Sequence, residues 1–177
     1  MSQQSASSDY LKQVGEIVQE LGVLGHPPIL VGGMALVVLG SQRVTKDFDF
    51  VVGQIDEDIA EVLAIFYRRG LQLVSKIDKL GEIQSTIDNK NVAAARLKLD
   101  RPDSAYFFNP KTGLRIDLLF DFPLKAADLA KGATKIKVKS YALRIASTED
   151  LIRLKKLAQS NRSSPNDDQD LAFLKSL

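Results

Sequence analysis

The sequence has 177 residues, a length that suits one domain or one domain with a small helical addition. Hydrophobic residues make up 45% of it, which is enough for a packed core and argues against a disordered chain. The formal net charge of +2 provides no strong overall attraction for nucleic acid or membrane, although it is compatible with a local basic patch.

Metal chemistry is restricted by the residue types present. The sequence contains no cysteine and one histidine, His26, which excludes disulfides, thiolate metal sites and histidine-rich zinc sites. Any bound metal must therefore be held mainly by oxygen, and oxygen ligands favour Mg²⁺ or Mn²⁺.

The chain shows no targeting or membrane signal. Residues 1–8 are polar and lack the basic and apolar regions of a signal peptide, so we expect them to be disordered. The longest apolar run, residues 29–39, contains two glycines and is too short to span a bilayer. These features predict a cytoplasmic protein with no membrane partner.

The first half of the chain alternates helices and strands. Apolar residues at helical spacing predict a helix over residues 9–21, and the prolines at 27 and 28 follow its end. A short strand at 29–31, a glycine turn and a short helix at 34–39 come next, followed by a strand at 48–52. A third helix is predicted between a cap at Asp56 and a stop at Gly70.

The second half is richer in predicted strands. Extended segments are expected at 71–76, 82–87 and 92–99, with a hairpin turn at 89–91, and again at 114–120, 135–139 and 141–145. Ser147 and Asp150 form a capping box before a helix, and Asp167 can cap a last one. This order predicts an α/β or α+β fold with a mixed sheet flanked by helices, in which a core at 9–146 carries a packed helical pair at 147–177.

Two aspartates stand out at the start of the strand at 48–52. Side chains two residues apart on a strand point to the same face, so Asp47 and Asp49 lie roughly 7 Å apart along it. Their apolar neighbours make this repulsion costly unless a cation compensates it, and a divalent ion would do so. By itself the pair is also compatible with two solvated side chains at a strand edge.

A glycine pair and a third acid extend this pattern. Gly32-Gly33 stands between a buried strand and a helix, where backbone amides can approach a phosphate, or where the turn only requires a positive φ. Asp117 lies within an apolar strand and can complete a metal site, or pair with a base such as Arg115. Asp121, near the end of the same strand, fits a cap or turn better.

With these residues in place, the chain resembles the nucleotidyltransferase superfamily with the polymerase-beta-like core. The resemblance rests on the Gly-Gly turn, the Asp-x-Asp pair and the later acid, and covers most of the chain from about residue 29. The segment Arg43-x-Thr45-x-Asp47-x-Asp49 is most similar to a bacterial branch that includes abortive-infection toxins. In that branch a late helix carries a lysine, here Lys155, followed by an arginine and paired aspartates, here Arg162, Asp167 and Asp170.

The resemblance implies roles for these residues. Asp47, Asp49 and Asp117 would hold Mg²⁺ or Mn²⁺ and, with Lys155, form the catalytic set. An NTP would bind at a second group of residues: Gly32, Gly33, Arg43, Thr45 and Lys155. The segment 162–167 is slightly longer than the family spacing, which leaves the roles of Arg162, Asp167 and Asp170 open.

The expected reaction is the transfer of an NMP from an NTP to RNA, protein or a small molecule, in a role related to toxin–antitoxin systems. A non-catalytic module that binds nucleotide or a partner on the same fold is the main alternative. A phosphohydrolase using the same acids is a further one. Four basic residues could line an acceptor groove or face solvent, and we expect them to face solvent: Lys76, Lys79, Arg96 and Lys98.

Overall fold

The computed structural model describes residues 3–161 and 166–177, and its centre is one mixed sheet. The sheet has the strand order β4-β3-β5-β6-β2-β1-β8-β7. Its middle strands β2 and β6 run parallel, whereas β1 pairs with β2 in the antiparallel sense. The strands are β1 (Ile29–Val31), β2 (Asp47–Val52), β3 (Gln72–Ile77), β4 (Ile83–Ile87), β5 (Ser104–Phe108), β6 (Arg115–Phe120), β7 (Thr134–Val138) and β8 (Tyr141–Ile145).

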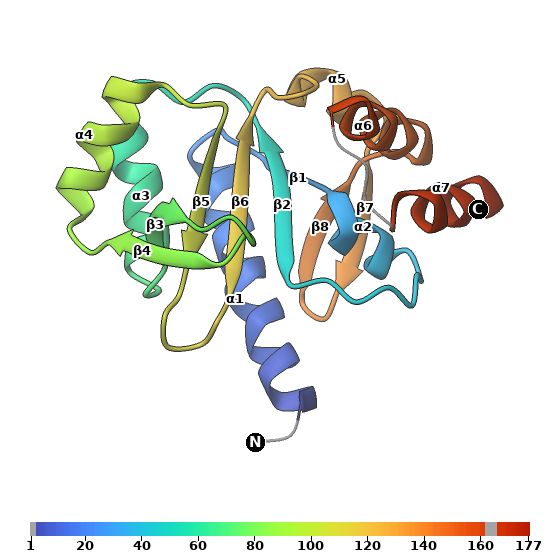
Figure 1. The fold of residues 1–177 in the computed structure, drawn as a ribbon, viewed down its shortest axis with the longest axis horizontal. Helices are drawn as coiled ribbons and strands as arrows, with labels where there is room; N and C mark the ends of the chain where they lie inside the picture. The colour runs from blue at the N-terminus through green and yellow to red at the C-terminus, as the bar shows by residue number, and fades with distance from the viewer. Residues whose placement is uncertain (1–2, 162–165) are drawn as a thin grey trace.

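The helices lie around this sheet. Figure 1 shows α1 crossing behind the strands, α3 and α4 beside β3 and β4, and α2, α6 and α7 gathered near β7 and β8. Their bounds are α1 (Gln3–Val23), α2 (Gly32–Val38), α3 (Ile59–Tyr67), α4 (Lys90–Asp100), α5 (Ala126–Gly132), α6 (Thr148–Asn161) and α7 (Asp167–Ser176). The predicted mixed sheet flanked by helices is thus confirmed.

Alternation along the central strands separates an apolar face from a polar one. Phe48 and Phe50 of β2 are buried, as are Ile116 and Leu118 of β6. Successive side chains of a strand point to opposite faces, so the acids between these residues occupy the other face. On the apolar face Phe66 of α3 stacks on a phenylalanine of β5 with ring centroids 4.0 Å apart.

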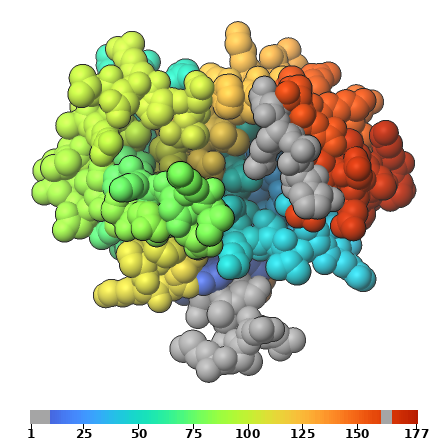
Figure 2. Space-filling view, in the orientation of Figure 1, coloured from blue at the N-terminus to red at the C-terminus, as the bar shows by residue number. Residues whose placement is uncertain are grey.

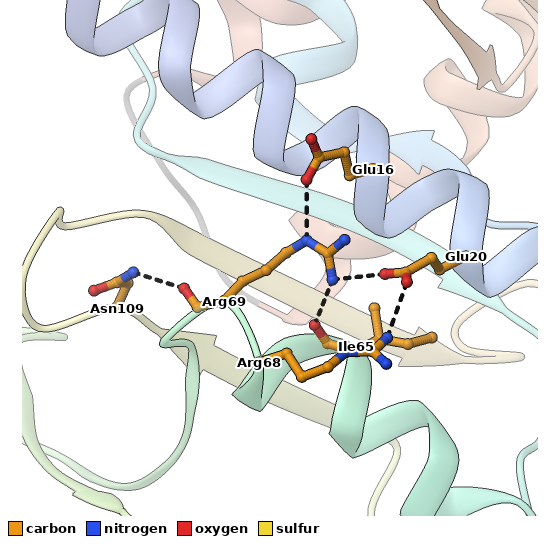
Figure 3. A network of polar contacts seen from close by, with 6 residues as sticks. All are labelled: Glu16, Glu20, Ile65, Arg68, Arg69 and Asn109. Carbon is orange, nitrogen blue, oxygen red and sulfur yellow. Dashed lines mark hydrogen bonds and ion pairs between the residues drawn. The ribbon is translucent and has the colours of Figure 1, made fainter.

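Polar contacts fasten α1 to α3 and to the turn between β5 and β6 (Figure 3). The Arg69 guanidinium contacts Glu16 at 3.4 Å and Glu20 at 2.6 Å, and Glu20 also contacts Arg68 at 2.9 Å. The carbonyl of Arg69 accepts a hydrogen bond from the buried Asn109 side chain at 3.1 Å. These contacts hold the helices in place behind the sheet.

The strand predicted at 92–99 is wrong, because residues 90–100 form helix α4. The Asn89 side chain accepts hydrogen bonds from the amides of Asn91 and Val92 at 2.9 and 3.1 Å, so it caps a helix instead of forming a hairpin turn. Alanines at 93–95 favour a helix, and the burial of Ala93 and Leu97 follows its period. Strand β5 and helix α5 were not predicted at all.

Other helix ends differ from expectation in detail. Helix α1 begins at Gln3, within the segment 1–8 expected to be disordered. Asp56 does not cap α3, which begins at Ile59, and Asp58 at its N-terminus contacts His26 at 2.5 Å. The predicted cap at Ser147 is confirmed, since its hydroxyl accepts a hydrogen bond from the Asp150 amide at 3.1 Å.

Membrane insertion receives no support from the helices. Over residues 3–161 and 166–177, no helix combines the length and the apolar character that a bilayer crossing requires.

Candidate active site

The three predicted acids lie together on the polar face of the two central strands. Strands β2 and β6 pair in register, with Asp49 directly opposite Asp117 and Asp47 opposite Arg115. Residues opposite each other on neighbouring strands share a face, and Asp47 and Asp49 share it because they are two residues apart. The structure therefore brings Asp47, Asp49 and Asp117 onto one surface.

The surroundings of Asp117 are unfavourable for its charged form. Its Oδ1 atom is buried and has no hydrogen-bond partner among the described residues. Burial, and then the negative charges of Asp49 and Asp47, raise the pKa of Asp117 to about 8. The structure does not show the alternative, in which a base such as Arg115 neutralises Asp117.

Tyr106 is a polar residue of this surface that the sequence did not reveal. It lies on β5 directly opposite Asp117, and its hydroxyl donates a hydrogen bond to Asp47 Oδ1 at 2.9 Å. Burial, followed by the charge of Asp47, raises the pKa of the Tyr106 hydroxyl. The alternation in Ser104-Ala-Tyr-Phe-Phe108, in which Ala105 and Phe107 are buried, was the available signal for this strand.

The glycine pair forms the start of α2, where Gly32 lies against Asp49 and Gly33 lies against Arg43. Gly32 has φ 69°, and a Cβ atom built on it would overlap the Asp49 carboxylate. A Cβ atom on Gly33 would lie 3.0 Å from the guanidinium carbon of Arg43. Glycine is thus required at 32 by conformation and space, and the pair lets charged groups pack closely on the backbone.

Arg43 and Lys155 belong to a charged cluster that joins the segment between α2 and β2 to α6 and α7. The Arg43 guanidinium binds the Asp170 carboxylate, and Lys155 Nζ contacts Asp170 at 2.7 Å and Asp167 at 3.2 Å. Both aspartates are buried, and the Lys155 side chain is 16% exposed. The cap predicted at Asp167 is wrong, because Asn166 is the N-cap of α7 and Asp167 lies in the first turn of that helix. Asp167 contributes instead to this cluster.

The other predicted residues have simpler positions. Thr45 is half-buried in the segment that leads into β2, two residues before Asp47. Asp121 is a turn residue, as expected, because it has φ 50° and accepts a hydrogen bond from the Ala126 amide at 2.9 Å. Arg162 lies outside the described residues.

A metal ion would suit the acids chemically. Over the described parts of the chain, no three carboxylate or imidazole groups are already arranged around one point as a finished metal site. The partnerless oxygen of Asp117 and its repulsion by Asp47 and Asp49 are the features that a divalent cation would relieve. All three candidates offer the hard oxygen ligands that Mg²⁺ prefers.

The surface around these strands is uneven. Figure 2 shows the segment of β3 and β4 standing forward on one side and that of α7 on the other, with the colour of β2 set back between them. The polar face of the central strands is therefore recessed between two parts of the molecule that are far apart in sequence.

Comparison with known proteins gives structural matches only. No family model and no curated protein matches the sequence. An antigenic nucleotidyltransferase-like protein from Paracoccidioides brasiliensis is 18% identical with a TM-score of 0.58, over 94% of this chain and 76% of that one. The lincosamide antibiotic adenylyltransferase LnuA with lincomycin bound is 13% identical with a TM-score of 0.57, over 93% and 96% of the two chains.

A further similar structure is the antibiotic-resistance factor ANT(2'')-Ia in complex with adenylyl-2''-tobramycin. It is 14% identical with a TM-score of 0.57, over 93% of this chain and 87% of that one. Identities this low establish a shared fold and nothing about substrates. In each case nearly the whole length of this chain superposes on a protein described as nucleotidyltransferase-like, as an adenylyltransferase or as bound to an adenylylated antibiotic. The chain therefore has the nucleotidyltransferase fold.

Proposed function

We propose that this protein transfers an NMP from an NTP to an acceptor with the help of Mg²⁺ or Mn²⁺. The observation that carries the proposal is the convergence of Asp47, Asp49 and Asp117 on one face of two parallel strands, with an Asp117 oxygen buried and partnerless. Three such carboxylates destabilise one another unless they serve a cation. Because many functions share one fold, this local chemistry supports the proposal more than the fold does.

The three carboxylates would hold the ions and align the reacting groups. A divalent ion bound here would neutralise charge on the phosphates and on the attacking oxygen. Asp117 would accept the proton of the acceptor's hydroxyl group. The acceptor's oxygen would then form a bond to the α-phosphorus of the NTP while the bond from that phosphorus to pyrophosphate breaks. Tyr106 would hold Asp47 in orientation through its hydrogen bond.

The turn at Gly32 and Gly33 would receive the phosphates of the NTP. Arg43 supports this placement because its guanidinium lies against Gly33 and could contact a phosphate there. Thr45 would lie beside the metal ligands, at the start of β2. Lys155 would act through the same cluster, since it shares the Asp170 carboxylate with Arg43.

The acceptor of the nucleotide is open among RNA, protein and small molecules. Structures similar in fold include an adenylyltransferase that binds an antibiotic, which keeps a small hydroxyl compound among the candidates. A role in the cytoplasm as a toxin-like transferase remains part of the proposal on the strength of the motif around residues 43–49 and the late Lys155.

The test is transfer from an NTP labelled on the α-phosphate to a lysate, to purified tRNA and to candidate small molecules. Asp49→Asn should lower label transfer by more than 100-fold, on the order of the loss of one main electrostatic group. Asp128→Asn is the matched control, because Asp128 is 62% exposed on α5. Full transfer by Asp49→Asn would refute the assignment.

The same experiment separates the alternatives. Release of pyrophosphate together with transfer supports the proposal, whereas release of phosphate from the NTP indicates a phosphohydrolase. NTP binding in calorimetry that depends on Asp49 but leads to no turnover with any acceptor indicates a non-catalytic binding module.

A further inference from the structure

The hairpin of β7 and β8 carries an unusual concentration of positive charge. Between residues 132 and 147 there are four basic residues and no acidic one: Lys135, Lys137, Lys139 and Arg144. The whole chain has a net charge of +2, so all the other residues together have a net charge of −2 (+2 − 4 = −2). The hairpin therefore carries a charge of +4 within a chain whose other residues are slightly acidic overall.

The pairing of the two strands sets like charges opposite each other. Lys135 of β7 is directly opposite Arg144 of β8, and neither forms an ion pair with any described residue. Like charges at opposite positions destabilise a sheet. An anion bound between Lys135 and Arg144 would compensate the repulsion of their positive charges.

A pocket is present at the same place. It lies between α1 and the hairpin, with a volume of about 330 Å³. Its lining includes Lys135 and Arg144 together with Gln19, Pro27, Pro28 and Tyr141. Tyr141 contacts α1, and alternation along β8 puts the Arg144 side chain, with Lys135 opposite it, on the other face of the hairpin. The pocket therefore adjoins the two residues without enclosing their charged groups, which share the face of the sheet that carries the acids.

Protection of a sheet edge explains only part of this pattern. Lysines on an edge strand hinder pairing with other chains, and β7 is the last strand of the sheet. Arg144, however, lies on β8, which pairs with β1 and β7 on its two sides, so edge protection gives no reason for it.

We propose that the basic hairpin binds the phosphodiester backbone of a nucleic acid through the face that carries Lys135 and Arg144. A single phosphate could satisfy the pair of Lys135 and Arg144. Lys137 presents a further exposed positive charge roughly 7 Å along β7, and a row of charges matches a polyanion. The charge on both strands thus favours a strand of nucleic acid over an isolated anion.

The hairpin lies close enough to the acids for a bound strand to serve as acceptor. Strand β8 is separated from β2 only by β1, and neighbouring strands are about 4.8 Å apart. A nucleic acid held at β7 and β8 would therefore need only a few nucleotides to reach β2. The acceptor role depends on the proposed transfer activity, whereas binding at the hairpin does not.

The test measures binding of a fluorescein-labelled single-stranded RNA by anisotropy at salt concentrations from about 50 to 200 mM. The variant Lys135→Gln/Arg144→Gln should weaken binding by on the order of 25-fold near 0.1 M salt and make the salt slope shallower by about 1.4, because two phosphate contacts are lost. The matched control is Lys76→Gln/Lys79→Gln, which removes two exposed charges at the β3–β4 end of the sheet and should change affinity less than twofold.

Three results would overturn the proposal. They are no RNA binding by the wild-type protein at the lowest salt, equal weakening by both double variants, and displacement of the RNA by low concentrations of inorganic phosphate at constant ionic strength. The last would indicate a pocket for a small anion. RNA binding by a wild-type protein that transfers no nucleotide to any acceptor would refute the transfer activity and leave the hairpin site standing, so the two failures are distinguishable.

Discussion

Replacing Asp117 with asparagine tests whether its charge destabilises the metal-free protein. The pKa of Asp117 is raised from 3.8 in a free carboxyl to about 8 in the folded protein. The folded state therefore binds more protons than the unfolded state between these values, and stability falls as pH rises through that window. Below pH 3.8 both states are protonated, and the penalty is absent.

The magnitude follows from the size of the shift. From pH 3.8 to pH 7 the penalty grows over roughly three pH units at about 1.4 kcal/mol each, which sets an upper bound of about 4 kcal/mol. Asparagine has nearly the same shape as a neutral aspartic acid. Asp117→Asn should therefore match the wild type near pH 4 and exceed its unfolding free energy by about 2–4 kcal/mol at pH 7.

The assay is urea unfolding followed by circular dichroism between pH 4 and pH 9 in the presence of a chelator. The measured quantity is the difference between variant and wild type, because other titrating groups cancel in it. Added Mg²⁺ should stabilise the wild type and not the variant. Asp128→Asn should follow the wild type throughout. A difference that stays constant from pH 4 to pH 8 would show that Asp117 is not held among the other two acids.

Three further changes probe the neighbouring groups. Lys155→Met leaves two buried carboxylates with less positive charge, so the unfolding free energy should fall by about 3–5 kcal/mol. Lys155→Arg keeps the charge and should lose less. Equal losses for the two variants in urea unfolding would contradict this reasoning. Gly32→Ala places a Cβ atom against Asp49 at a residue with a positive φ. Label transfer should fall at least tenfold, and the unfolding free energy should fall by about 1–2 kcal/mol. Unchanged transfer and stability would show that the turn can move to accept the Cβ atom. Lys135→Glu puts opposite charges across the hairpin, so the unfolding free energy should rise by about 0.2–1 kcal/mol while RNA binding weakens. A lower unfolding free energy for this variant would contradict the prediction.

The geometry of the candidate site could be predicted from the sequence as far as local pattern extends. The two-residue spacing of Asp47 and Asp49 placed them on one face, and the apolar residues around Asp117 indicated a central strand for it. The capping residue Ser147 and the turn residue Asp121 were recognisable because their hydrogen bonds are local in sequence. The same local reasoning failed for α4. Its alternating polar residues predict a strand, although its alanines favour a helix.

Only the tertiary structure decided which distant residues meet. Tyr106 reaches Asp47 because β5 pairs with β6, and no spacing in the sequence encodes that neighbour. Arg43 and Asp170 contact each other across 127 residues, and Lys155 joins them because α6 and α7 pack beside α2. The sequence by itself determined which face of each strand carries the acids, since the side-chain period of a strand is fixed. It did not determine the order of strands in the sheet, because that order depends on the burial of apolar surface over the whole chain.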